Sequence, residues 1–326
     1  MPELSACIET FALRNHFTIS RGSKTDTVVV TATVSDGDVS GRGECGPNAR
    51  YGETPESVHA AILDRAPDIA AGLDRHALAS RMPAGAARNA IDCALWDYEA
   101  KRSGEPVWRI AGLTPPQPLD TAFTLSVDTP DAMARAAAEN AHRPVLKLKL
   151  TGDNDLARVR AVRDAAPGPD LIVDANEAWD VAAYEACVPA FLDLGVRLVE
   201  QPFPAGRDDA LASLERPIPV CADESFHDAA SLEGLVGRYD VVNIKLDKTG
   251  GLTEALAAAK AARAAGFDVM VGCMVGTSLA MAPAFLVAQG ARFVDLDGPL
   301  LLSQDREPPL RADGSRLSAP ERALWG

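Results

Sequence analysis

Short apolar runs recur at even spacing after residue 115, and each run ends close to a polar or charged residue. The eight runs span residues 121–125, 145–150, 171–174, 196–200, 218–223, 241–245, 269–274 and 293–297. An Ala- and Leu-rich amphipathic stretch follows each run, which indicates a helix after a strand. The polar residues near the ends of the runs are 22 to 28 positions apart. Eight even strand–helix units close a parallel (β/α) barrel.

The chain before these runs has a different pattern. Residues 27–34 are rich in β-branched side chains, residues 35–38 have the composition of a turn, and residues 39–44 can form a returning strand. Helices are predicted over residues 54–71 and 84–103, which are rich in good helix formers. Strands followed by helices indicate a small α+β unit.

The expected fold class is therefore α/β, a (β/α) TIM-like barrel with an N-terminal α+β domain. We expect the α+β domain at residues 1–115, the barrel at 116–300, and a tail at 301–326 that returns to the first domain. A doubly wound open sheet, the alternative fold, also alternates strands and helices. It usually carries a Gly-rich phosphate loop after its first strand, and the sequence has no such loop.

Composition narrows the classes of function. The 326 residues include 32 Lys plus Arg against 46 Asp plus Glu, a formal net charge of −14. This excess of acids argues against a nucleic-acid or anionic-membrane partner, because phosphate binding needs a positive field. Six scattered cysteines without a C-x-x-C pair suggest reduced thiols.

Segment 269–291 carries no charged residue and is long enough to cross a bilayer. It contains Gly272, Gly276 and Pro283, so a short strand, a polar turn and a buried helix explain it better. The N-terminal residues lack the basic start and apolar block of a signal peptide. We therefore expect a cytoplasmic protein with no membrane partner.

Three carboxylates end three adjacent strands of the predicted barrel: Asp174, Glu200 and Asp223. The carboxyl ends of barrel strands converge at one mouth, where three unpaired anions would repel one another. A hard divalent cation with oxygen ligands, Mg²⁺, resolves that repulsion. The alternative is that each acid caps the following helix, which three acids at matched spacing make less attractive.

Lysines flank these acids. Lys147 and Lys149 are two residues apart, so on a strand they share a face, and Lys245 ends the sixth run. We expect the metal and the neighbouring Lys147 to lower the pKa of Lys149, and the metal to lower the pKa of Lys245. Two bases on opposite sides of a metal-bound carboxylate suit inversion of an α-carbon. One lysine removes the α-proton, Mg²⁺ stabilises the enediolate, and the other lysine returns a proton to the opposite face.

Five motifs carry a resemblance to a known family. They are K-L-K at 147–149, D-A-N-E-A-W at 174–179, E-Q-P at 200–202, A-D-E-S at 222–225 and N-I-K-L-D-K-T-G-G-L at 243–252. The chain resembles the enolase superfamily over nearly its whole length, and within it the muconate-lactonizing subgroup. That superfamily uses a Lys or His base with Mg²⁺. The resemblance implies that the N-terminal unit is a capping domain whose loops close over the barrel mouth.

The same lysines and metal ligands serve cycloisomerases, o-succinylbenzoate synthases, N-acylamino acid racemases and dipeptide epimerases, so the substrate must be decided elsewhere. Asp295 and Asp297 lie two apart in the eighth run. In dipeptide epimerases the matching D-x-D binds the free α-ammonium of the substrate. Arg21 matches the arginine that recognises the glutamate side chain in epimerases acting on L-Ala-D/L-Glu, although a surface arginine is the alternative. Lys147 should contact the substrate carboxylate, and Thr124, at the end of the first run, is a further candidate substrate contact.

The resemblance thus implies an Mg²⁺-dependent epimerase that acts on small-molecule dipeptides such as L-Ala-D/L-Glu, which cell-wall peptide would supply. The sequence leaves open whether the chain forms a homo-oligomer. Many subgroup members carry an acid after the methionine of the seventh strand, whereas Val275 follows Met274 here. An N-acylamino acid racemase or cycloisomerase of the same subgroup is the first alternative. A metal-free Schiff-base lysine barrel, which borohydride would trap, is the second, and a non-catalytic binding protein is the third.

Overall fold

An antiparallel sheet of three strands forms the base of the N-terminal domain in the computed structural model, which describes residues 1–326. β1 (Glu3–Ile19) pairs with β2 (Gly22–Asp36), and β2 pairs with β3 (Val39–Cys45). The predicted turn joins β2 to β3, where Gly37 has φ +61°. β1 was not predicted, because charged and polar residues interrupt its apolar positions and most of its residues are exposed or half-buried.

Helices cover this sheet. They are α1 (Pro55–Leu63), α2 (Ala66–Ala70), α3 (Arg75–Arg81), α4 (Ala86–Ser103) and the short α5 (Val107–Ile110). The single helix predicted over residues 54–71 is wrong, since it is divided before Pro67, which lies in the first turn of a new helix. α4 is buried along most of its length and ends at Gly104 with φ +81°. It packs against β3 and also against the short barrel helix α9 (Leu246–Thr249).

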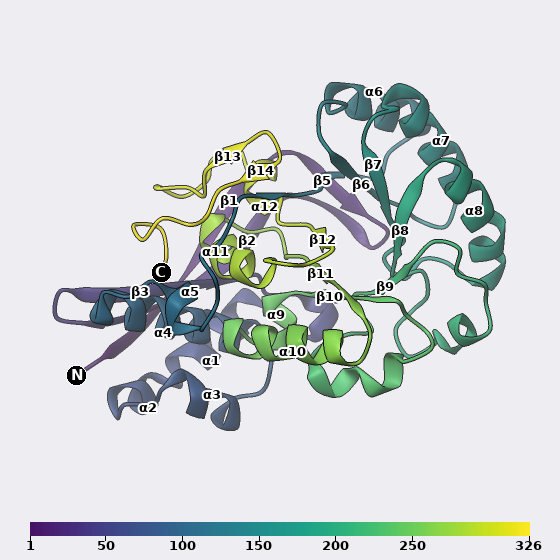
Figure 1. Cartoon of the computed structure of the whole chain (residues 1–326). Helices are drawn as coiled ribbons and strands as arrows, with labels where there is room; N and C mark the ends of the chain where they lie inside the picture. The colour runs from purple at the N-terminus through teal and green to yellow at the C-terminus, as the bar shows by residue number, and fades with distance from the viewer.

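The eight predicted strands of the barrel are confirmed, and neighbours in the sequence are neighbours in the sheet (Figure 1). They are β5 (Phe123–Leu125), β6 (Val145–Lys149), β7 (Asp170–Asp174), β8 (Val196–Glu200), β9 (Val220–Ala222), β10 (Val241–Ile244), β11 (Asp268–Val271) and β12 (Phe293–Val294). All adjacent pairs are parallel. Ala122 N donates to Val294 O at 2.8 Å, which joins the first strand region to the last.

Helices pack along the outside of the strands, with α6, α7 and α8 forming one continuous flank in Figure 1. The regular helices are α6 (Pro130–Glu139), α7 (Asp155–Ala165), α8 (Val181–Asp193), α10 (Leu252–Ala264), α11 (Ser278–Val287) and α12 (Gly298–Leu301). Only 3₁₀ turns follow β8 and β9, so the expectation of a regular helix after every strand is wrong there. Prolines at 202, 204, 217 and 219 interrupt the first of these connections, and each lacks a backbone N–H.

The segment 269–291 forms β11, a turn and the buried helix α11, as predicted. No helix of the chain has both the length and the apolar character needed to cross a membrane. The C-terminal tail contacts both domains. Its strand β14 (Arg316–Leu317) pairs with β4 (Leu119–Asp120) and with β13 (Ala312–Asp313), and Trp325 Nε1 donates to Cys93 O on α4.

Candidate active site

The ends of the barrel strands bring the predicted polar residues together at one mouth. β6 and β7 pair so that Lys149 lies beside Asp174, and β8 places Glu200 beside Asp174 on the other side. Asp223 follows β9, and Lys245 follows β10. These side chains are buried, together with those of Lys147, Asp295 and Asp297. Residues up to 150 positions apart in the chain therefore form one compact charged cluster.

Lys147 lies at the centre of this cluster. Its Nζ is 2.6 Å from Glu200 Oε2, 2.7 Å from Asp295 Oδ2 and 3.2 Å from Asp174 Oδ2. Burial by itself lowers the pKa of Lys147, but the three carboxylates outweigh it and hold the pKa well above its ordinary value. Lys147 therefore remains an ammonium, which suits binding of an anion and not proton abstraction.

The two lysines predicted to be acid and base contact different carboxylates. Lys149 Nζ lies 2.6 Å from Asp174 Oδ2, and Lys245 Nζ lies 2.7 Å from Asp223 Oδ2. Burial lowers the pKa of Lys245, yet Asp223 and Glu200 raise it further, so its net pKa is above the ordinary value. The expected lowering therefore does not arise from the protein's own charges, since carboxylates surround this ammonium.

Each of the three acids has one oxygen fixed by a donor other than these lysines. Asp174 Oδ1 accepts from Asn176 N at 2.9 Å, and Glu200 Oε1 accepts from Asn243 Nδ2 at 2.8 Å. Asp223 Oδ1 accepts from Lys248 Nζ at 2.7 Å. Sequence reasoning did not single out Lys248, although it belongs to the motif at 243–252. The second oxygens of the acids all face lysines at the mouth.

This donor set fits a hard cation. The second oxygens of Asp174, Glu200 and Asp223 come from adjacent strands, and the buried Oδ1 atoms of Asn176 and Asn243 have no hydrogen-bond donor. Oxygen-only sets of this kind suit Mg²⁺. No three acidic, histidine or cysteine side chains are arranged as a complete ligand cluster, and Lys147 Nζ instead lies between Asp174 and Glu200.

A cavity of about 590 Å³ opens over the cluster, and both Lys149 and Lys245 line it. Its barrel side also includes Asp223 and Glu224, and its other walls come from the capping domain, around Phe17, Arg21, Lys24 and Tyr51. The volume suits a dipeptide-sized ligand. Lys147, Asp295 and Asp297 lie below this surface, within the barrel.

Arg21 lies in this cavity wall, but glutamates already bind it. Its Nη2 is 2.8 Å from Glu224 Oε1, and its Nη1 is 3.2 Å from Glu177 Oε2. Lys24, three residues later near the start of β2, is different. Its one hydrogen bond is to Thr27 Oγ1, at 3.4 Å, and shielding from solvent lowers its pKa. Sequence reasoning missed Lys24, and its position three residues after Arg21 in the same polar segment was the available signal.

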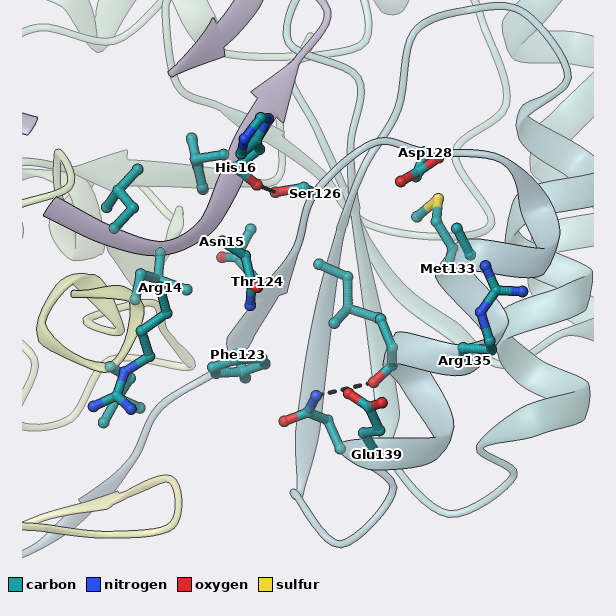
Figure 2. Close-up of a pocket in the computed structure, with 18 residues that line it drawn as sticks. Arg14, Asn15, His16, Phe123, Thr124, Ser126, Asp128, Met133, Arg135 and Glu139 are labelled. Atoms are coloured by element: carbon teal, nitrogen blue, oxygen red, sulfur yellow. Dashed lines mark hydrogen bonds between the residues drawn. The ribbon is translucent and has the colours of Figure 1, made fainter. Parts of the chain in front are cut away.

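Thr124 is the middle residue of β5, and its N–H donates to Asp297 Oδ2 at 2.7 Å. Thr124 also lines a second cavity, a hollow of about 420 Å³ that is separate from the cavity over the charged cluster. Figure 2 shows this hollow between Arg14, Asn15 and His16 on one side and α6, with Met133, on the other. The structure therefore places Thr124 as a support for Asp297.

The loop after β11 is held by the capping domain. Asn48 Nδ2 donates to Met274 Sδ at 3.3 Å, and Thr27 Oγ1 donates to Val275 O at 2.8 Å. Glu44 accepts from the backbone N of Thr277 at 2.7 Å and from its hydroxyl. The segment after Met274, which lacks the subgroup's acid, thus packs against β2, β3 and the loop after β3 of the capping domain.

Comparison with known families agrees with this architecture. Residues 4–112 match the family model "Mandelate racemase / muconate lactonizing enzyme, N-terminal domain", and residues 131–323 match "Enolase C-terminal domain-like". The chain belongs to the enolase superfamily, with both domains of the mandelate racemase/muconate lactonizing group.

Individual relatives narrow the comparison. The chain is 46% identical to an L-Ala-D/L-Glu epimerase of Escherichia coli K12, over 93% of this chain and 95% of that protein. It is 45% identical to an N-acetyl-D-glutamate racemase of Pseudoalteromonas sp, over 91% and 95%. A solved structure from Agrobacterium tumefaciens is 53% identical, with a TM-score of 0.98 over 100% of both chains. That protein is described as an enolase family member with homology to dipeptide epimerases, with sodium and L-Ala-L-Glu bound. A dipeptide epimerase from Enterococcus faecalis V583, complexed with Mg and L-Leu-L-Tyr, is 28% identical with a TM-score of 0.91, over 98% and 97%.

Proposed function

We propose that this chain is an Mg²⁺-dependent dipeptide epimerase that inverts the α-carbon of the C-terminal residue in L-Ala-D/L-Glu. The observation that carries the proposal is that Lys149 and Lys245 line one cavity from β6 and from the end of β10. Three strands that end in or just before a carboxylate separate them in the sheet. This arrangement supports a mechanism in which a substrate binds between two proton carriers.

In this reaction a neutral lysine takes the α-proton from one face as the C–H bond breaks. The electron pair moves into the substrate carboxylate, and the other lysine, as an ammonium, donates its proton to the opposite face of the α-carbon. Asp174, Glu200 and Asp223 would hold the cation. The chemistry that Mg²⁺ supplies there is positive charge beside the substrate carboxylate, which acidifies the α-proton. Lys147 is assigned to the same carboxylate because it stays an ammonium.

Asp295 and Asp297 are assigned to the α-ammonium of the dipeptide. Asp295 Oδ1 is buried without a hydrogen-bond donor, so it can accept one from a ligand. Burial and the neighbouring Asp295 raise the pKa of Asp297 to about 7. A cation placed beside this pair would relieve the repulsion between the two carboxylates.

Lys24 and Arg21 are assigned to the glutamate side chain, with Lys24 as the principal contact. Arg21 already neutralises Glu224 and Glu177, whereas no acidic side chain is hydrogen-bonded to the ammonium of Lys24. The Lys24 ammonium interacts with Asp26 only through space, so it is available to an anion that enters the cavity. This revises the sequence-based assignment, in which Arg21 acted alone.

Racemisation of an N-acylated glutamate is the second candidate. The Pseudoalteromonas relative carries that activity in its name. The specific observation in its favour is the ion pair between Lys147 and Asp295, which neutralises one acid of the eighth strand without any substrate ammonium. The two candidates differ in whether the substrate amine is free or acylated.

One experiment separates them. The protein is incubated with Mg²⁺ in D₂O with either L-Ala-L-Glu or N-acetyl-L-Glu, and deuterium at the α-carbon of glutamate is followed by mass spectrometry. Faster exchange in the dipeptide, lost in Asp295→Asn, supports the proposal. Exchange in N-acetyl-L-Glu alone would refute it. Since both substrates present the same glutamate, only the N-terminal group is under test.

A further inference from the structure

Two residues just after β7 have left-handed backbone conformations that side chains other than glycine rarely adopt. Asn176 has φ +44° and Glu177 has φ +69°. Such a conformation costs free energy and persists only where surrounding contacts hold it. Here it presents the Asn176 carbonyl and the Glu177 side chain to the two loops of the capping domain.

The Glu177 carboxylate accepts four hydrogen bonds from three separate segments. Arg50 donates from Nε and Nη2, both at 2.9 Å, and Arg21 donates from Nη1 at 3.2 Å. Ala205 N, in the loop after β8, donates at 2.8 Å. The Glu177 side chain is 9% exposed, although the arginines that it holds are more than one-third exposed. One buried carboxylate thus connects both capping loops to the barrel.

The neighbouring carbonyl strengthens the same contact. Asn176 O accepts from Ser20 Oγ and from Arg21 Nη1, both at 3.0 Å. The first loop, which includes Arg21, and the second loop, which includes Arg50 and Tyr51, both line the substrate cavity. Anything that holds these loops against Glu177 therefore also shapes the cavity.

We propose that Glu177 is a positioning residue that holds both capping loops closed over the barrel mouth, so that the loops open and close together. This inference rests on the proposed function for its kinetic consequence. Glu177 has no hydrogen bond to Lys149 or Lys245, so it acts through the loops and not on the reacting proton.

The contacts of Glu177 also favour the charged form of its carboxylate. Burial raises its pKa, but the hydrogen bonds from Arg50 and Ala205 outweigh burial and hold the pKa below its ordinary value. The ion pairs of Glu177 with the two arginines therefore stabilise the closed state. Opening of the loops requires the arginines to separate from the carboxylate.

The test compares Glu177→Gln with a control variant in β7, the strand that precedes Glu177. Asp170→Asn removes the exposed ion pair between Asp170 and Arg197 at the opposite end of β7. Limited trypsin digestion reports loop opening, because Arg21 and Arg50 are cleavage sites within the loops. Steady-state kinetics with L-Ala-L-Glu and Mg²⁺ report the consequence for substrate binding.

We expect Glu177→Gln to be cleaved at Arg21 and Arg50 about tenfold faster than the wild type, since two charge-assisted contacts weaken. KM should rise about tenfold while kcat changes less than threefold and the pH profile keeps its shape. Asp170→Asn should match the wild type in every measurement. Arg50→Lys, which keeps the cleavage site but loses the two-pronged contact, should show the same changes and serves if Glu177→Gln does not fold.

Unchanged cleavage and unchanged KM in both variants would overturn the inference. A loss of kcat at constant KM would also overturn it, because that result places Glu177 in the chemistry. If the wild type turns over no dipeptide, the proposed function fails on its own. Digestion still decides the role of Glu177 in that case, since it needs no substrate.

Discussion

Gly272, just after β11, lies so close to Asn243 and to the proposed proton carrier Lys245 that the smallest side chain should disturb both. A Cβ at this position would lie 2.7 Å from Asn243 Oδ1 and 2.9 Å from its Nδ2. It would also lie 3.1 Å from Lys245 Cε. Asn243 is fully buried and donates to Glu200 Oε1, so it has little room to move. The perturbation is therefore Gly272→Ala.

The magnitude follows from these distances. Asn243 Oδ1 must move by about 0.7 Å to reach ordinary contact at 3.4 Å, which strains its hydrogen bond to Glu200. Overpacking of this kind costs about 1–3 kcal/mol of stability. Because misplacing a catalytic group by ~1 Å can cost about 10²-fold in rate, the shift of Glu200 and Lys245 should lower kcat about a hundredfold. The melting temperature should fall by only about 5 °C.

The assay measures kcat for L-Ala-L-Glu epimerisation beside thermal unfolding, with Gly168→Ala as the control. A Cβ at Gly168 meets only Ala141 O at 3.9 Å, an ordinary contact. Both variants change the unfolded chain in the same way, so their difference reports the native site. If Gly272→Ala keeps more than half of the wild-type kcat, the described approach to Asn243 and Lys245 is wrong.

Three further predictions concern charge. Lys24→Ala should raise KM for L-Ala-L-Glu about tenfold, because a charge-assisted contact is worth about 1.5–3 kcal/mol. KM for L-Ala-L-Leu, measured in the same kinetic assay, should be nearly unchanged. An equal rise for both dipeptides would show that Lys24 does not bind the glutamate side chain. Since the pKa of Asp297 is raised to about 7, the kcat/KM ratio of L-Ala-L-Glu to N-acetyl-L-Glu should fall as pH drops below about 7, and a ratio independent of pH would contradict this assignment. Burial raises the pKa of Asp247 to about 7 in the folded chain. As the pH rises from about 4 to 7, this carboxyl therefore ionises first in the unfolded chain, and the free energy of unfolding of the wild type falls. Asp247→Asn can still accept from Gly46 N and Asn89 Nδ2, and it should avoid this loss, which is at most about 4 kcal/mol. Calorimetry should show that the stability advantage of Asp247→Asn over the wild type is larger at pH 8 than at pH 5. An equal difference at both pH values would contradict this prediction.

The barrel could be predicted from the sequence because polar residues end each apolar run at even spacing. That periodicity reflects the backbone itself, since parallel strands buried on both faces require continuous apolar runs. β1 could not be predicted in the same way. Its long, mostly solvent-facing surface is stabilised by pairing with β2 and not by an apolar face of its own.

Some contacts of the candidate site could likewise be predicted from the sequence, and others could not. Lys149, Asp174 and Glu200 could be placed together because neighbouring strands bring their ends together. The partners of Glu177 could not, since Arg50 and Arg21 are 127 and 156 positions away and belong to another domain. Which cation remains free in the cavity also depends on these distant pairings, and so Arg21 was singled out before Lys24.

The central claim is that Lys149 and Lys245 act on opposite faces of one α-carbon. The most direct measurement is exchange of the α-proton of glutamate in D₂O, followed by NMR for L-Ala-L-Glu and L-Ala-D-Glu with Lys149→Ala and with Lys245→Ala. Each variant should lose epimerisation while still exchanging the proton of one epimer, and the two variants should prefer opposite epimers. Full epimerisation by either variant, or exchange of the same epimer by both, would contradict the two-lysine mechanism.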